Sequence, residues 1–200
     1  MEQRRGRPRS EEARRAILRA VVDELGEGGP AALPVDRVAS RAGVSKATIY
    51  RWWRSKHEVV LEALVDALDT ELDLTETGRL REDLRRQLCQ LVTTMTGDLG
   101  TVIRTVIAAG QGDHRLNECF RRQVLAKTRG RIEATLARGV VEGELRGDAD
   151  LDVVVDTLVS PLWMRLVLGH GTIDHALVDK LIDTVLDGVG VGEREPATTG

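Results

Sequence analysis

Residues 45–52 place several hydrogen-bond donors within about two turns of a potential helix. The segment reads Ser45, Lys46, Ala47, Thr48, Ile49, Tyr50, Arg51 and Trp52. Lysine and arginine donate to the O6 and N7 acceptors of guanine, so Lys46 and Arg51 could read guanine edges. A helix of this kind lies in the DNA major groove with its first turns against base edges, and its N-terminal amides can meet phosphate. The residue types and spacing therefore predict contact with DNA. The residues available for this contact are Lys46, Ala47, Thr48, Tyr50 and Arg51.

The stretch that must position these donors, Val38 to Tyr50, has the layout of a helix-turn-helix. Ala39 is small where two helices must approach each other. Gly43 can adopt the left-handed backbone conformation that the turn requires. Ile49 and Trp53 should face the core, which leaves the polar side of the second helix exposed.

Apolar residues at three- and four-residue spacing predict helices along the rest of the chain, and no segment alternates like a strand. The first helix should begin at Ser10, whose hydroxyl can cap free amides. Residues 55–58, Ser-Lys-His-Glu, fit a capping box that opens a fourth helix. Gly97 and Gly100 should break a later helix, and Pro161 should bend another. We expect an all-α fold of about nine helices.

Charge is divided unevenly along the 200 residues. Residues 1–57 hold 13 Lys and Arg against 7 Asp and Glu, a net +6, whereas residues 58–200 hold 16 against 25, a net −9. A basic front segment suits phosphate, which supplies most non-specific affinity for nucleic acid. The 2% aromatic content favours helices packed through aliphatic side chains. No apolar run approaches the roughly 20 residues that span a bilayer, so we expect a cytoplasmic protein.

Clusters that would form a disulfide or bind a metal are not evident. Cys89 and Cys119 lack CxxC or Cys/His ligand spacing, so we expect free and mostly buried thiols. His170 and His175 flank Asp174, but this spacing does not place both imidazoles on one helix face. We therefore expect neither a metal nor a cofactor.

Residues 42–64, AGVSKATIYRWWRSKHEVVLEAL, closely resemble the recognition region of the tetracycline-repressor family. The resemblance implies a DNA-binding transcription regulator. The positions that touch bases and nearby phosphates in such proteins are Lys46, Ala47 and Thr48. Phosphate-side positions are Tyr50, Trp52 and Lys56, and Arg37 should face the DNA backbone. Ser45 and Arg51 complete the candidate contacts in this segment.

Two residues depart from the family pattern. Pro34 stands where the family usually has Thr or Ser to cap the second helix, although proline is tolerated in a first helical turn. Asp36 stands where a basic base-reading residue sometimes lies. Its carboxylate would repel phosphate but could accept from cytosine. We expect Asp36 to face away from the DNA.

The segment Arg5-Gly6-Arg7-Pro8-Arg9 precedes the first helix as a basic arm, residues 1–9. Arg5 and Arg7 could insert into an A·T-rich minor groove, where narrow width concentrates negative potential. A solvated tail that contributes only diffuse electrostatic attraction is equally consistent with the sequence.

The chain behind the DNA-binding segment resembles the family's dimerisation and effector domain more loosely. The similarity rests on Gly143-Glu144-Leu145-Arg146 and Ser160-Pro161-Leu162. We predict a DNA-binding domain over residues 10–55, a dimerisation and effector domain over 56–188, and a flexible tail over 189–200.

A symmetric dimer is expected because one short recognition helix reads too few bases. Two protomers can present their helices to half-sites about 34 Å apart, or a multiple of this, on a pseudo-palindromic operator. The last two helices have apolar stripes wide enough for an internal and an intermolecular face, so they are the predicted four-helix interface. Purely internal packing is the alternative.

A pocket for a small, mostly apolar effector is implied by the family architecture. The candidate lining residues are Met95, Leu99, Ile103, Phe120, Val124 and Trp163. Each is equally consistent with a place in the core, since helical apolar spacing is first a packing signal. His57, beside the capping box, could act as a switch between domains or lie solvated in the first turn of its helix.

The function expected from these features is a homodimeric repressor that a small molecule releases from its operator. The alternatives are an effector-independent regulator and an architectural DNA-binding protein. An enzyme is not expected, because the chain lacks a nucleophile elbow, a phosphate loop, a metal triad and paired carboxylates in a recognisable setting.

Overall fold

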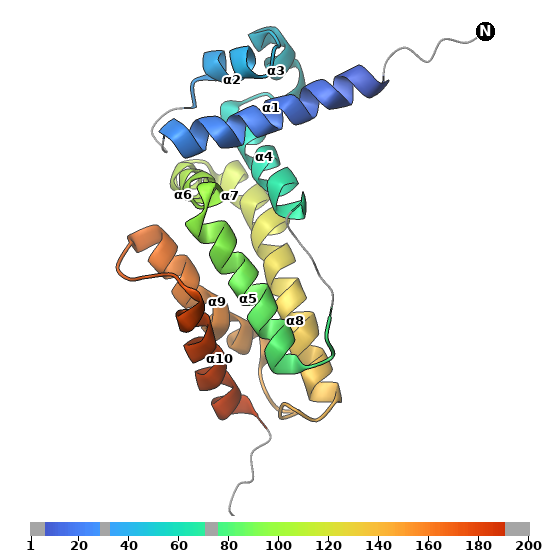
Figure 1. Ribbon diagram of the computed structural model, residues 1–200, viewed down its shortest axis with the longest axis vertical. Helices are drawn as coiled ribbons and strands as arrows, with labels where there is room; N and C mark the ends of the chain where they lie inside the picture. Colours follow the sequence, from blue (N-terminus) through green and yellow to red (C-terminus); the bar gives the residue numbers. More distant parts are fainter. Residues whose placement is uncertain (1–6, 29–32, 71–75, 191–200) are drawn as a thin grey trace, which may run out of the picture. The chain divides into compact units, whose positions relative to one another are not determined.

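The computed structural model describes residues 7–28, 33–70 and 76–190, and these are almost entirely helical (Figure 1). The helices are α1 (Arg7–Gly28), α2 (Val35–Arg41), α3 (Lys46–Trp52), α4 (Lys56–Thr70), α5 (Leu80–Thr96), α6 (Asp98–Gly110), α7 (His114–Phe120), α8 (Ala126–Val141), α9 (Leu151–Leu168) and α10 (His175–Val189). A π-helical turn, Arg121–Leu125, joins α7 to α8 with helical backbone angles at both junctions. The described chain therefore contains nine continuous helical segments, and the predicted all-α fold is confirmed.

The helices form two compact units. The first contains α1 to α4, the last turn of α5, α6, α7 and the π-helical turn. The second contains most of α5 together with α8, α9 and α10. No helix of the described residues is long and apolar enough to cross a membrane.

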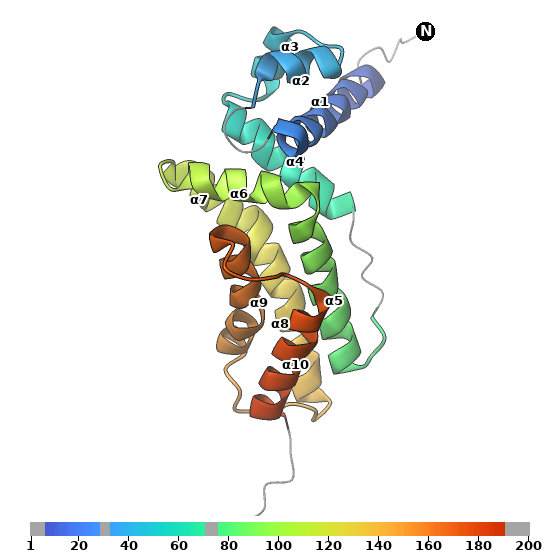
Figure 2. The ribbon, with the colours of Figure 1, turned by 60° about the vertical axis from the view of Figure 1, so that its left-hand side comes forward.

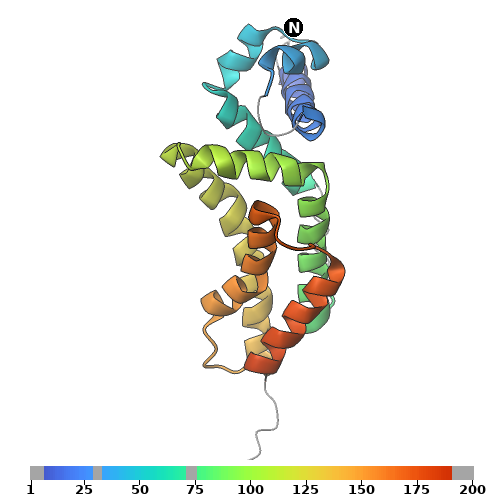
Figure 3. The same cartoon turned by 90° about the vertical axis from the view of Figure 1, so that its left-hand side faces the viewer.

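In the first unit, α1 is the central helix. It packs against α2, α4 and α6, and α2 and α3 lie on the opposite side of α1 from α6 (Figures 1 and 3). The apolar stripe predicted for this helix is buried at Ile17, Leu18, Val21 and Leu25. The 3.6-residue period of that stripe explains the burial, because it places these side chains on one face.

The first helix begins earlier than predicted. It starts at Arg7, not at Ser10, because Pro8 occupies the first turn, where a missing N–H costs no helical hydrogen bond. Arg7 is therefore part of α1 and not of an extended arm. Arg5 lies outside the described residues.

A tight turn joins α5 to α6 at the two predicted glycines. Gly97 is the N-cap of α6, and Gly100 lies in its first turn. A Cβ atom on Gly100 would lie 1.9 Å from the carbonyl oxygen of Met95, a contact that no side chain can make. This close approach explains why a glycine is needed there.

In the second unit, α8, α9 and α10 run side by side with the unit's part of α5 (Figure 2). Asp83 of α5 is 2% exposed and accepts from the N–H of Thr77, the Thr77 hydroxyl, and Arg138 of α8. Burial alone would raise the pKa of Asp83, but the hydrogen bonds from Thr77 and Arg138 outweigh it and lower the pKa to about 2. Asp83 therefore fastens α5 to α8 as a carboxylate.

The last two helices differ from expectation in two details. The helix α9 continues through Pro161, so the proline removes one N–H donor without ending the helix. The folded chain also extends past residue 188, since Arg146 N–H donates to Val189 O and Leu145 forms a β-bridge with Gly190. The predicted flexible tail was wrong for residues 189 and 190, and residues 191–200 lie outside the described part.

Candidate nucleic-acid interface

The turn between α2 and α3 has the geometry that the sequence predicts. Gly43 has φ of +65°, and Val44 N–H donates to Ala39 O across the turn at 3.0 Å. Ser45 then caps α3, because its Oγ accepts from Thr48 N–H at 3.2 Å. These local contacts fix where α3 begins and in which direction it leaves the turn.

The face that α3 presents is decided by its two apolar anchors. Ile49 and the C-cap residue Trp53 are buried in the first unit. The side chains left exposed on α3 and at its N-cap are Ser45, Lys46, Ala47, Tyr50 and Arg51. Thr48 and Trp52 are half-buried. The Thr48 hydroxyl lies 3.0 Å from that of Ser45, and Arg51 lies over the Trp52 ring at 5.9 Å.

Arg37 is held against α1. Its Nε lies 2.8 Å from Oε2 of Glu24, a carboxylate that is only 3% exposed, and Arg41 Nε lies 3.3 Å from the other oxygen. Both arginines also pair with Glu27. A carboxylate this buried requires opposite charge, so the two arginines anchor α2 to α1. The predicted contact of Arg37 with phosphate stays a prediction.

The two departures from the family pattern have different outcomes. Pro34 is the N-cap of α2 and offers no side-chain cap; its carbonyl accepts from the N–H groups of Arg37 and Val38 instead. Asp36 does not face away from the recognition segment, which corrects the expectation from the sequence. Its carboxylate forms an ion pair with Lys46 at the start of α3. The expectation failed because the sequence does not show which face of α2 lies toward α3.

The joint between α3 and α4 is capped from both sides. Ser55 Oγ accepts from Glu58 N–H at 3.2 Å, as a capping box requires. The Glu58 carboxylate reaches back to Arg54 N–H at 2.8 Å, one residue before the position expected for a capping box. Lys56, the first residue of α4, is exposed.

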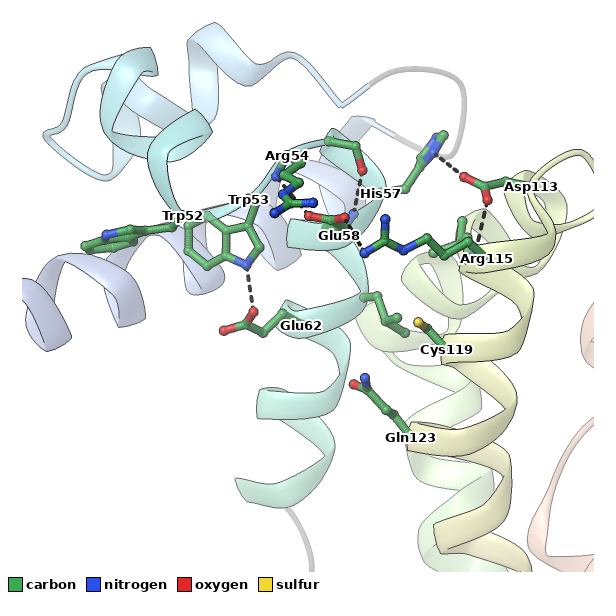
Figure 4. Close-up of a pocket in the computed structure, with 13 residues that line it drawn as sticks. Trp52, Trp53, Arg54, His57, Glu58, Glu62, Asp113, Arg115, Cys119 and Gln123 are labelled. Carbon is green, nitrogen blue, oxygen red and sulfur yellow. Dashed lines mark hydrogen bonds and ion pairs between the residues drawn. The ribbon is translucent and has the colours of Figure 1, made fainter.

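One carboxylate on α4 ties three helices together. Glu62 accepts from the indole N–H of Trp53 at 2.7 Å and from Arg14 Nε of α1 at 2.8 Å (Figure 4). The C-terminal end of α3 is therefore held to α4 through Trp53. Sequence patterns gave no sign of this contact, because Arg14 and Glu62 are 48 residues apart.

A polar pocket of about 570 Å³ opens beside this joint (Figure 4). Its lining side chains come from residues 52–62 and 113–123. Two contacts cross it from α4 to the start of α7: Glu58 pairs with Arg115 at 3.6 Å, and His57 Nδ1 lies 3.8 Å from Asp113. The sequence pointed to His57 at this joint but not to Asp113 or Arg115.

The predicted effector-binding residues are all away from this pocket. Met95, Leu99, Ile103, Phe120 and Val124 are buried in the first unit. Trp163 is half-buried in the second unit, and none of the six lines the polar pocket. Their assignment to an effector site stays a prediction. The two cysteines are free, and each is half-buried.

Comparison with known proteins agrees with the helix-turn-helix and with the domain behind it. Residues 17–63 match the family model for bacterial regulatory proteins of the tetR family, and residues 74–185 match the tetracyclin repressor-like C-terminal domain. The chain belongs to the TetR family of transcription regulators. Its DNA-binding unit and the domain implied by the resemblance are therefore those of a DNA-binding regulator.

Several TetR-family proteins resemble the chain over nearly its whole length. The HTH-type transcriptional regulator YdeS of Bacillus subtilis is 35% identical over 94% of this chain and 96% of its own. The DNA-binding transcriptional repressor TetR of Mycobacteroides abscessus is 33% identical over 89% and 94%. The solved TetR family regulator SCO0332 is 35% identical, with a TM-score of 0.74 over 89% of this chain and 98% of its own.

Proposed function

We propose that α3 is the recognition helix and that it reads DNA through its first turn. Lys46, Ala47 and Thr48 would meet base edges, with Arg51 available to guanine. Tyr50, Trp52 and Lys56 would meet phosphate, together with Ser45 and Arg37. The observation that carries this proposal is the burial of Ile49 and Trp53 behind a capped helix, which leaves the donors on the outside.

Arg5 and Arg7 are proposed to add contacts at the flank of the site. Arg7 belongs to α1 near its N-terminus, so its reach is set by a helix and not by a free arm. Their contribution is electrostatic attraction, with minor-groove insertion as the more specific possibility.

A homodimer formed through α9 and α10 is the proposed assembly. Four large apolar side chains of α9 are exposed in the single chain: Val153, Met164, Val167 and Leu168. Apolar side chains gathered on one helix favour association, because burial removes them from water. Two copies related by a twofold axis would address a pseudo-palindromic operator with half-sites about 34 Å apart or a multiple of this.

Repression that a small, mostly apolar molecule relieves is the proposed mode of regulation. The relative from Mycobacteroides abscessus is named a repressor, and a solved regulator of the same fold from Saccharomonospora viridis, 23% identical, is described in complex with choline. The α4 helix is a suitable transmitter, since it contacts α3 through Glu62 and α7 through Glu58. A coupling free energy of about 1 to 3 kcal/mol would suffice.

Selection of bound duplexes from a random pool by the full-length protein tests the proposal. Lys46→Ala should relax base preference within the selected half-site, whereas Lys56→Ala should weaken binding to all sequences and reduce its salt dependence. Binding without any sequence preference would point to an architectural role. A library compound that changes both thermal stability and operator affinity would support effector control; no such compound would favour an effector-independent regulator.

A further inference from the structure

Asp36 lies beside the lysine that the proposed function assigns to base reading. Its Oδ1 pairs with Lys46 Nζ, so an acceptor from the first turn of α2 meets a donor from the first residue of α3. The side chains are 74% and 52% exposed, respectively. The pair is therefore part of the outer surface of the helix-turn-helix.

The direction of Asp36 is set by the packing of α2 and not by the ion pair itself. Arg37 and Arg41, one turn apart, both bind Glu24 of α1. Successive residues on a helix differ by about 100°, so these anchors leave Asp36 and Ser40 on the exposed side of α2. A DNA molecule that meets the start of α3 would also meet the carboxylate.

Folding stability gives little reason for this pair. An ion pair between exposed side chains contributes little and is screened by salt. Facing DNA, the carboxylate repels phosphate, so its presence lowers affinity unless the DNA offers it a donor. The function of the pair must therefore be sought in recognition.

Base-edge chemistry supplies the matching partner. In the major groove, the N4 amino group of cytosine donates and an aspartate accepts, whereas O6 and N7 of guanine accept from lysine. One G·C pair presents these groups next to each other. A thymine in place of the cytosine would oppose the carboxylate with the acceptor O4.

We propose that Asp36 and Lys46 together read one G·C base pair in each half-site, with Asp36 on cytosine N4 and Lys46 on guanine. This inference rests on the proposed function, because it requires α3 to lie in the major groove. Asp36 is thus a specificity-determining residue. On other sequences, it pairs with Lys46 and keeps that charge from phosphate.

The test compares full-length wild type, Asp36→Ala and Ser40→Ala by selection from a random duplex pool. The selected operator and its G·C to A·T variant are then titrated at several salt concentrations. Wild type should prefer the G·C pair, and Asp36→Ala should reduce that preference about tenfold while the other positions are unchanged. On non-operator DNA, Asp36→Ala should bind more tightly, with a salt slope steeper by about one contact. Ser40→Ala, on the same face of α2, should behave as wild type.

Identical base preferences for Asp36→Ala and wild type would overturn the inference. So would a wild-type preference for adenine or thymine at the position that responds to Asp36. If Lys46→Ala alters base preference and Asp36→Ala does not, the inference fails while the proposed function stands. If wild type selects no DNA, or Lys46→Ala leaves base preference unchanged, the proposed function fails instead.

Discussion

Single polar side chains hold the recognition segment in place, and Trp53 is the clearest case. Its ring is buried, and its indole N–H reaches Glu62 on the next helix. Trp52, the preceding residue, is half-buried, and its ring contacts that of Trp53 edge to face. Trp53 therefore joins two helices by a hydrogen bond, whereas Trp52 contributes ring packing at the surface of the same segment.

Trp53→Phe is expected to lower the free energy of unfolding by about 1 to 2 kcal/mol, since Glu62 loses a donor in a partly buried site. Trp52→Phe is the matched control and should cost less than about 0.5 kcal/mol. Urea denaturation followed by circular dichroism measures both. Equal losses for the two variants would mean that the Trp53 to Glu62 bond contributes nothing specific.

Acid sensitivity should trace to Asp83. The pKa of Asp83 is about 2 in the folded protein, below the value of about 3.9 expected for an unfolded chain. The folded state therefore binds this proton less readily, so the stabilisation is complete above pH 4 and disappears as the pH falls toward 2. It amounts to about 2 kcal/mol. Asp83→Asn should reduce stability at pH 7 and flatten its decline between pH 4 and pH 2; a decline as steep as in wild type would contradict the assignment.

At the scale of elements, connections decide as much as helices do. The α5 to α6 turn accepts only glycine at position 100, because the Met95 carbonyl occupies the space of a side chain. Gly130 lies inside α8, and a Cβ atom added to it would meet no neighbouring group within 4 Å. The same substitution should thus have opposite effects at the two sites.

Gly100→Ala should destabilise the protein by about 2 kcal/mol or more, since the backbone of the turn must move. Gly130→Ala should stabilise it by about 0.5 to 1 kcal/mol through helix propensity. Thermal melting of both variants, with an alanine at one site at a time, gives the comparison. A Gly100→Ala protein as stable as wild type would show that the turn relaxes without cost.

At the scale of the whole molecule, two copies of the chain are needed for an operator with two half-sites. The exposed apolar side chains of α9 are the surface on which the proposed dimer depends. Val141, at the end of α8, is also exposed and apolar but belongs to another helix. It provides a control for the general effect of adding charge.

Leu168→Glu is expected to weaken the dimer by about 2 kcal/mol or more, because it buries an unpaired charge in the interface. Light scattering after size-exclusion chromatography reports the assembly, and titration of a two-half-site duplex reports the consequence for DNA. Val141→Glu should leave both unchanged. A stable Leu168→Glu dimer would place the interface elsewhere on the chain.

Local chemistry in the sequence was sufficient for the DNA-binding segment. The glycine at the turn, the Ser45 and Ser55 caps, the helical spacing and the basic front segment each act within a few residues, so each is visible in the sequence. The same locality explains two errors. The start of α1 depended on Pro8 being accepted into a first turn, and the end of the fold depended on a bridge from Leu145 to Gly190.

Only the tertiary structure decided which polar groups meet. Glu62 with Arg14, Asp83 with Arg138 and Glu58 with Arg115 join residues that lie far apart in the chain. Helical periodicity tells which face of each helix is apolar, but it does not tell which charged residue of another helix lies opposite. Asp36 illustrates the difference. Its charge and position were plain from the sequence, whereas its partner, Lys46, followed from the rotation of α2 against α1 and from the angle of the turn.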